Sequence, residues 1–289
     1  LDRAVSNVLR VKFRLGLFEN PFAPECTPIR LRMDLVEDSE LALRAARESL
    51  VLIRNSDNIL PLPADIRRLA VIGPAAAPAL LGTYCDPPMR GAWDMEDPEG
   101  EGLLAGLRRA FPDTEIVWYP GCAFDTPRES TEITAVTQFD TFLRNSSGVR
   151  TTDENMRNAV EAAWSADVII AAVGDQPWLT TGEGKDTAMA VLPGNQPALV
   201  EALAQTGKPV ILVAFVDRPV VLTHELRAAA ACLVAWQPGR RGGTAVAEAL
   251  RGIVNPGGRL PVTLPAHPCV IPLSSDTVLG HRKYLDLKD

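Results

Sequence analysis

One carboxylate in the sequence has the setting of a catalytic group. Glu183 lies between Gly182 and Gly184, inside a long segment that covers residues 174–196. Glycines on both sides let the backbone bring a carboxyl group over a substrate pocket, where it can donate or accept a proton. Asp186 follows closely and is suited to order the loop through a turn or to bind a substrate hydroxyl. The alternative for Glu183 is an exposed carboxylate with no function, which is the commoner fate of a single Glu.

A strand and a helix are expected to position this segment. The apolar run at residues 167–173 predicts a buried strand before it, and residues 196–205 have the pattern of an amphipathic helix. The segment between them is longer than the roughly two to six residues that usually connect such elements. Long loops beyond the carboxyl ends of strands are where α/β proteins carry their chemistry. The sequence therefore predicts a functional loop at residues 174–196.

The rest of the chain alternates between apolar strands and amphipathic helices. Further strands are predicted at residues 69–73, 115–119, 209–216 and 231–236, and further helices at residues 1–18, from 38 onward, 99–110, 155–164, 222–230 and 243–251. The strands are continuously apolar, which indicates burial on both faces and a parallel sheet between two helix layers. The predicted fold class is α/β, with a doubly wound, mainly parallel sheet. The polar residues 125–152 break this rhythm and read as an insertion.

Composition excludes several classes of protein. The chain has 289 residues, of which 46% are hydrophobic and 22% charged, as in ordinary globular proteins. Its formal charge of −7 argues against a nucleic-acid partner or an anionic membrane surface. No apolar run approaches the roughly 20 residues of a membrane span. The 5 cysteines and 3 histidines have no metal-ligand spacing, so we expect no metal or other cofactor. The N-terminus indicates no compartment, and without an initiator Met the chain is expected to start inside a longer protein.

Several minor motifs have structural interpretations. Residues 238–243 (PGRRGG) are expected to form a tight strand–helix turn, with a phosphate cradle as the alternative. Residues 217–219 also read as a turn at a strand end, with Arg218 facing a domain outside this chain as the minor alternative. His224 and His267 are expected at the surface, because neither has a carboxylate at motif spacing. Cys232 is interpreted as a core residue, and we predict no disulfide.

Short motifs along nearly the whole chain resemble the second, α/β sandwich domain of family 3 glycoside hydrolases, the β-glucosidases and β-xylosidases. They are residues 4–22 (AVSNVLRVKFRLGLFENPF), 45–62 (AARESLVLIRNSDNILPL), 69–74 (LAVIGP), 81–84 (LGTY), 119–122 (YPGC), 166–174 (ADVIIAAVG), 192–196 (LPGNQ), 206–213 (TGKPVILV), 235–245 (AWQPGRRGGTA) and 255–265 (NPGGRLPVTLP). Each motif alone is weak. In this order and at this spacing they are specific.

The resemblance implies a role for the loop. In this family the general acid/base is a Glu in a context like Gly-Glu-Gly-x-Asp-Arg, which Glu183 and Asp186 match. Retaining glycosidases use two carboxyl groups about 5–5.5 Å apart, one as acid/base and one as nucleophile. Trp178 is expected to form an apolar platform for a sugar ring or to pack the base of the loop. The chain departs from the family pattern at Thr187, where Arg is usual, and at Asp175, where Glu is common.

The resemblance also implies that the chain is one part of an enzyme. The family's nucleophilic Asp lies in an N-terminal (β/α)8 barrel, and residues 1–33 resemble the last helix and linker of such a barrel. Residues 34–289 are then the sandwich domain, with 280–286 (GHRKYLD) near its end, before a fibronectin-like domain. The expected function is hydrolysis of terminal β-D-glucosides or β-D-xylosides together with that barrel, and the isolated chain is expected to be inactive. The alternative is a non-catalytic α/β module, either a degenerate member or a scaffold for a partner domain, and Thr187 favours it.

Overall fold

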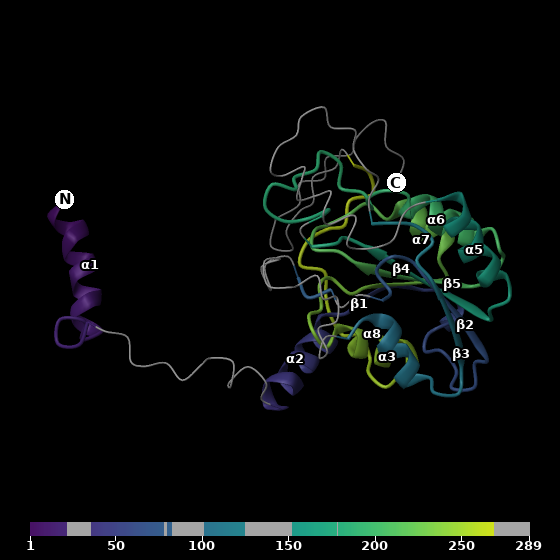
Figure 1. Ribbon diagram of the computed structural model, residues 1–289, viewed down its shortest axis with the longest axis horizontal. Helices are drawn as coiled ribbons and strands as arrows, with labels where there is room; N and C mark the ends of the chain where they lie inside the picture. Colours follow the sequence, from purple (N-terminus) through teal and green to yellow (C-terminus); the bar gives the residue numbers. More distant parts are fainter. Residues whose placement is uncertain (22–35, 78–79, 83–100, 125–151, 178, 269–289) are drawn as a thin grey trace. The chain divides into compact units, whose positions relative to one another are not determined.

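The computed structural model of the chain describes residues 1–21, 36–77, 80–82, 101–124, 152–177 and 179–268, and these form two units (Figure 1). Unit 1 covers residues 1–40 and unit 2 covers residues 41–289. Residues 125–151 of the predicted insertion at 125–152, the segment 280–286 and Trp178 lie outside the described residues. None of the described helices is long and apolar enough to cross a membrane.

Unit 1 contains an amphipathic helix. Helix α1 (Asp2–Arg14) carries Asp2 in its first turn and Lys12 and Arg14 in its last turn, an arrangement that favours the helix dipole. None of its residues is buried. Its exposed large apolar side chains are Val5, Val8, Leu9, Val11 and Phe13. An amphipathic helix of this kind normally buries its apolar stripe against another element.

Unit 2 is built on one six-stranded sheet with the strand order β1-β6-β5-β4-β2-β3. The strands are β1 (Val51–Asn55), β2 (Arg68–Ile72), β3 (Glu115–Tyr119), β4 (Val168–Gly174), β5 (Val210–Phe215) and β6 (Ala231–Val234). Strands β2 to β6 are parallel to their neighbours, whereas β1 pairs with β6 in the antiparallel direction. Every residue of β4, β5 and β6 is buried. The prediction of a mainly parallel α/β sheet is therefore confirmed, and the antiparallel edge strand is an addition to it.

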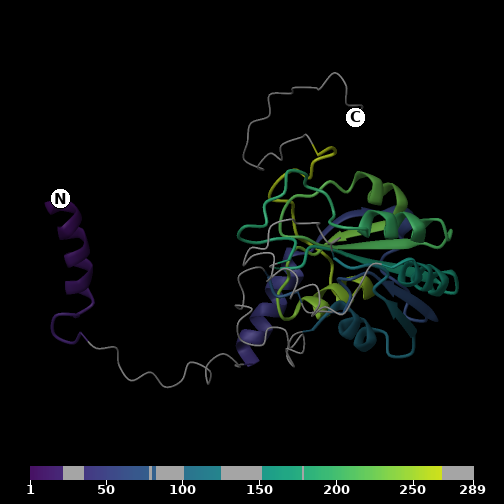
Figure 2. The ribbon, with the colours of Figure 1, turned by 45° about the horizontal axis from the view of Figure 1, so that its top comes forward.

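Helices cover both faces of this sheet, as Figures 1 and 2 show. The helices of unit 2 and its junction are α2 (Val36–Ser49), α3 (Leu103–Ala110), α5 (Asp153–Trp164), α6 (Gln196–Ala204), α7 (Thr223–Ala228) and α8 (Gly242–Arg251). The sheet's two faces belong to two separate apolar clusters, because neighbouring residues such as Ile169 and Ile170 point to opposite sides. Leu107 of α3 and Leu250 of α8 join the cluster of Ile170, and Leu199 of α6 joins that of Ile169.

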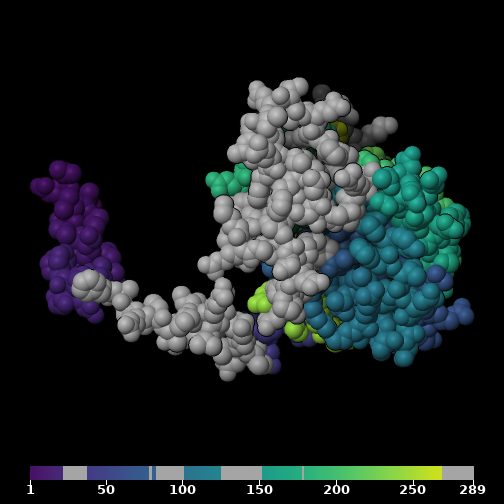
Figure 3. All heavy atoms as spheres, viewed as in Figure 1, coloured from purple at the N-terminus to yellow at the C-terminus, as the bar shows by residue number. Residues whose placement is uncertain are grey.

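The two helix layers pack differently. Helices α3 and α8 approach so closely that a Cβ added at Gly106 would lie 2.2 Å from the Gly243 carbonyl oxygen. On the other face, α5 packs beside β3 and α6. The space-filling view shows the surface of α3 and β3 meeting that of α5 without a gap (Figure 3). The sheet is thus enclosed on both sides, and its carboxyl edge is where the connecting loops emerge.

Candidate functional site

The loop with Glu183 leaves the carboxyl end of β4, as the sequence predicts. Strand β4 ends at Gly174, and α6 begins at Gln196. Gly174 has φ +147°, and a Cβ there would lie 1.8 Å from the carbonyl oxygen of Phe215 on the neighbouring strand β5. Any larger residue would push β4 away from β5 at this point. The close approach fixes where the loop leaves the sheet.

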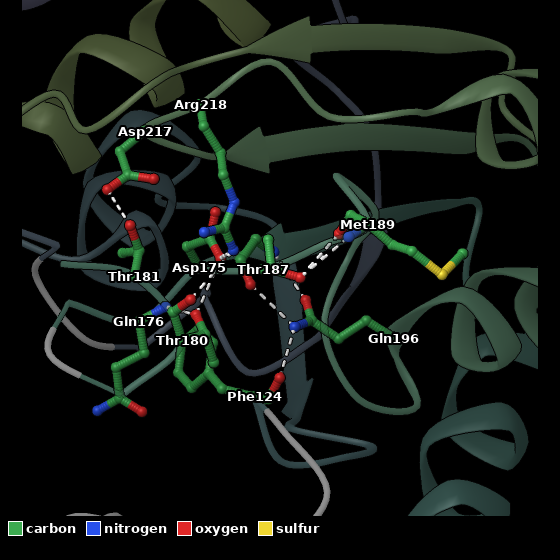
Figure 4. A network of polar contacts seen from close by, with 11 residues as sticks. Phe124, Asp175, Gln176, Thr180, Thr181, Thr187, Met189, Gln196, Asp217 and Arg218 are labelled. Carbon is green, nitrogen blue, oxygen red and sulfur yellow. Dashed lines mark hydrogen bonds and ion pairs between the residues drawn. The ribbon is translucent and has the colours of Figure 1, made fainter. Parts of the chain in front are cut away.

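A buried amide side chain ties the two ends of the loop together. Gln196 is fully buried, and its Oε1 accepts the Gly174 N–H at 2.7 Å. Its Nε2 donates to the Gly174 carbonyl at 2.8 Å and to the Phe124 carbonyl at 3.0 Å. Figure 4 shows this side chain between the strand end and Phe124. One residue therefore satisfies three backbone groups at the neck of the loop.

An ion pair fixes the first part of the loop to the connection between β5 and α7. Asp175 is 1% exposed, and its Oδ1 accepts hydrogen bonds from Nη2 of Arg218 and Oγ1 of Thr180, each at 2.9 Å. The same Arg218 nitrogen donates to the Thr180 carbonyl at 3.0 Å. Gln176 donates its backbone N–H to the Thr180 hydroxyl at 3.0 Å. These contacts appear together in Figure 4.

The environment of Asp175 opposes its charge. Burial raises the pKa of this carboxyl to about 6, although the Arg218 charge and the Thr180 hydroxyl both act to lower it. The nearby negative charge of Asp217 also raises the pKa. Oδ2 of Asp175 is buried and has no hydrogen-bond partner in the described part of the chain. Among the described residues, only one oxygen of the carboxylate therefore accepts hydrogen bonds.

Two further contacts extend this fixed region toward Glu183. Leu179 is buried and joins the apolar cluster of Ile170. Thr181 is 4% exposed and donates its hydroxyl to Asp217 on the β5–α7 connection. The loop is thus anchored from Asp175 to Thr181.

The tip of the loop holds the predicted acid/base in solvent. Glu183 and Asp186 are both exposed, and neither side chain has a hydrogen bond or ion pair within the described residues. Gly182 and Gly184 have φ values of +121° and +72°, which favour glycine at both positions. Thr187 makes a local contact within the loop, because its hydroxyl donates to the Met189 carbonyl at 3.0 Å. A carboxylate held this way can reach a substrate that lies against the carboxyl edge of the sheet.

The sequence predicts only part of the surroundings of Glu183. The sequence singled out Glu183, Asp186 and Trp178, but not Arg218 or Gln196 as structural partners of the loop. Asp175 stands out in the sequence only as a departure from the family pattern, in which Glu is common at its position. The motif LPGNQ contained Gln196, and a polar residue at the start of an apolar helix was the available signal.

The structure describes the minor motif at residues 238–243, both of the histidines singled out above, and two of the cysteines. Residues 238–243 form a turn with Gly239 at φ +73°, and the Gly243 N–H donates to the Glu101 carbonyl at 3.0 Å rather than to an open cradle. His224 and His267 are exposed. Among the described residues, no group of three or more His, Cys, Asp or Glu is placed to hold a metal ion. Cys122 and Cys232 are buried free thiols, and burial raises the pKa of each to about 12.

The fold and the loop define an α/β sandwich domain that presents a carboxylate beyond the carboxyl edge of its sheet. Residues 50–284 match the model of the glycosyl hydrolase family 3 C-terminal domain. The chain therefore belongs to glycoside hydrolase family 3 and carries its C-terminal domain.

Named relatives support the same assignment. The chain is 35% identical to the lysosomal beta glucosidase of Dictyostelium discoideum over 92% of its own length and 30% of the relative's. It is 32% identical to a beta-xylosidase of Formosa agariphila, over 95% of its own length and 34% of the relative's. A solved beta-glucosidase involved in saponin metabolism from intestinal bacteria superposes with a TM-score of 0.75 at 32% identity, over 92% of this chain and 38% of that one. The chain thus spans about a third of the length of the curated relatives it matches.

Proposed function

We propose that this chain supplies the general acid/base, Glu183, of a retaining β-glycosidase that acts on terminal β-D-glucosides or β-D-xylosides. The observation that carries the proposal is the exposed Glu183 at the tip of a loop whose first part is anchored to the sheet. Family membership and the names of the relatives support the substrate class.

In the proposed reaction Glu183 acts twice. As an acid it donates its proton to the glycosidic oxygen while the bond between that oxygen and the anomeric carbon breaks. The nucleophile bonds to the anomeric carbon in that step, and Glu183, now a carboxylate, takes a proton from the water that attacks this carbon and displaces the nucleophile. Asp186 is proposed to order the loop or to bind a substrate hydroxyl, and Trp178 to provide an apolar platform or pack the loop base.

The nucleophile is proposed to lie in a (β/α)8 barrel of the same protein. Residues 1–33 are then the last helix and linker of that barrel, and residues 34–289 form the sandwich domain. The exposed apolar stripe of α1 supports this division, because such a stripe requires a covering partner. The greater length of the relatives is consistent with it. The chain by itself is expected to be inactive.

The test joins this chain to a family 3 barrel domain and measures hydrolysis of aryl β-glucosides and β-xylosides. Glu183→Ala is expected to lower the rate by about 10²–10⁴-fold, the usual contribution of a general acid/base. External azide is expected to restore part of the rate, because it attacks the anomeric carbon without needing a base. Asp186→Asn serves as the comparison, with a smaller loss and no rescue by azide. Unchanged activity of Glu183→Ala would overturn the proposal.

The second candidate is a non-catalytic α/β module that packs on a partner domain. Thr187 favours it, because its hydroxyl bonds locally to Met189 where an Arg would extend toward neighbouring carboxylates. In that case the joined protein would hydrolyse no more aryl glycoside than the barrel domain alone. Glu183→Ala would then make no difference.

A further inference from the structure

We propose that Asp175 and Arg218 form an ionic lock that positions the Glu183 loop for proton transfer. Both are positioning residues, since neither is proposed to touch the substrate. The inference rests on the proposed function of Glu183 and adds the residues that determine where its carboxylate is held.

Stability alone does not account for this ion pair. The Asp175 side chain is 0% exposed and that of Arg218 is 23% exposed, so both groups lose hydration on folding. Buried ion pairs often contribute little net stability compared with apolar residues of similar volume, because desolvation offsets their attraction. Here the compensation is incomplete, since Oδ2 of Asp175 and Nε of Arg218 are buried without hydrogen-bond partners among the described residues. A charged pair in this setting is better explained by the geometry that it imposes.

That geometry fixes the residues just before Glu183. Nη2 of Arg218 bonds at once to the Asp175 carboxylate and to the Thr180 carbonyl, at 2.9 and 3.0 Å. The Thr180 hydroxyl closes the ring by donating to Asp175 at 2.9 Å. Residues 175 and 180, at the two ends of a short turn, are therefore held against one guanidinium group from the β5–α7 connection (Figure 4).

The position of Glu183 follows from this lock through a short connection. Only Thr181 and Gly182 separate Thr180 from Glu183, and the Thr181 hydroxyl donates to Asp217, which neighbours Arg218 in sequence. After Glu183, Gly184 is exposed and a Cβ there would meet no atom within 4 Å, and the Lys185 N–H donates to the Gly182 carbonyl at 3.0 Å. The lock thus acts on the proposed acid/base from its N-terminal side. A displacement of about 1 Å at a catalytic group can lower a rate about 100-fold. Loss of the lock can therefore lower the rate strongly if it displaces Glu183 by a similar distance.

The experiment uses the joined protein with two aryl glycosides that differ in leaving group. The dinitrophenolate of a 2,4-dinitrophenyl glycoside leaves with little help from an acid. The phenolate of a phenyl glycoside is a poorer leaving group and needs a proton from the acid. For Asp175→Asn we expect kcat/KM to fall about tenfold to a hundredfold on the phenyl glycoside. The loss on the dinitrophenyl glycoside should stay below about threefold. Arg218→Gln is expected to behave the same way, and Asp175→Glu, which keeps the charge, should recover most of the loss.

A matched control separates positioning from stability. Glu248→Gln breaks the ion pair in which Arg47 donates to Glu248 at 2.7 and 2.8 Å, between α2 and α8 and away from the loop. It is expected to lower stability without changing the ratio of the two rates. Equal losses on both glycosides for Asp175→Asn and Arg218→Gln, or no loss on either, would overturn the inference.

Two further variants keep the result decisive. If Asp175→Asn does not fold, Thr180→Val tests the same ring, because it removes only the hydroxyl that bonds Asp175 and Gln176. It should also lower the phenyl rate selectively, and an unchanged ratio contradicts the lock. Glu183→Ala distinguishes the two proposals. If this variant keeps its activity, the proposed function fails; if it loses activity selectively on the phenyl glycoside while the lock variants do not, only this inference fails.

Discussion

At the scale of single residues, Asp175 is predicted to make stability depend on pH. Its pKa of about 6 in the folded chain lies above the ordinary value of 3.8. Between these values the folded chain binds more protons than the unfolded chain, so stability falls as pH rises through this window. The difference corresponds to about 3 kcal/mol at most. The ionised carboxylate therefore destabilises the fold at neutral pH while it holds Arg218 in place.

The measurement compares urea unfolding of the chain and of Asp175→Asn at pH 4 and pH 7. The comparison between variants cancels the other titrating groups. We expect the free energy of unfolding of the wild-type chain, relative to that of the variant, to be higher at pH 4 than at pH 7. A relative stability that is constant with pH, or that increases toward pH 7, would show that Asp175 is ionised at no cost in the folded state.

At the scale of secondary structure, Gln196 joins β4 to α6 and is expected to be sensitive to substitution. Gln196→Ala leaves the Gly174 N–H, the Gly174 carbonyl and the Phe124 carbonyl without their partner. Each buried, unsatisfied group costs about 1–3 kcal/mol, so a loss of about 3 kcal/mol or more is expected. Amide exchange at Gly174 should become faster in the variant, which hydrogen exchange measured residue by residue can detect.

Gln196→Glu is the matched variant for this prediction. It keeps the acceptor for the Gly174 N–H but removes the donor to the two carbonyls. Amide protection at Gly174 should then survive better than in Gln196→Ala. Equal stability of the alanine variant and the wild type would mean that water replaces the side chain at the neck of the loop.

The elements themselves were predictable, because apolar runs such as β4 and β5 are continuous in the sequence and need burial on both faces. The partners of the loop were not. Asp175 and Arg218 are separated by 43 positions and meet only because β4 and β5 are neighbours in the sheet. Strand order depends on packing of the whole domain, which a single sequence does not encode locally. The antiparallel direction of β1 escaped prediction for the same reason.

At the scale of the whole molecule, helix α2 crosses the boundary between the two structural units and so helps to decide where the domains divide. The structure separates residues 1–40 from the rest, yet α2 runs without a break from Val36 to Ser49. Within α2, Ala46 is buried and Arg47 forms an ion pair with Glu248 of α8. We therefore propose that the whole of α2 belongs to the sandwich domain, and the proposed boundary before residue 34 keeps this helix intact.

Deletion of residues 1–33 tests this division. Helix α1 buries none of its residues, and a 13-residue helix is marginal in water without packing. Removing it is expected to change the free energy of unfolding of the sandwich domain by less than about 0.5 kcal/mol. It should also reduce self-association, because the exposed apolar stripe of α1 is lost.

Deletion of residues 1–49 removes α2 as well, including Ala46 and Arg47, and is expected to lower the free energy of unfolding by about 3 kcal/mol or more. Urea unfolding and light scattering of the two truncated chains measure both effects. If the shorter deletion destabilised the sandwich domain as much as the longer one, α1 would have to be part of that domain rather than of a separate barrel.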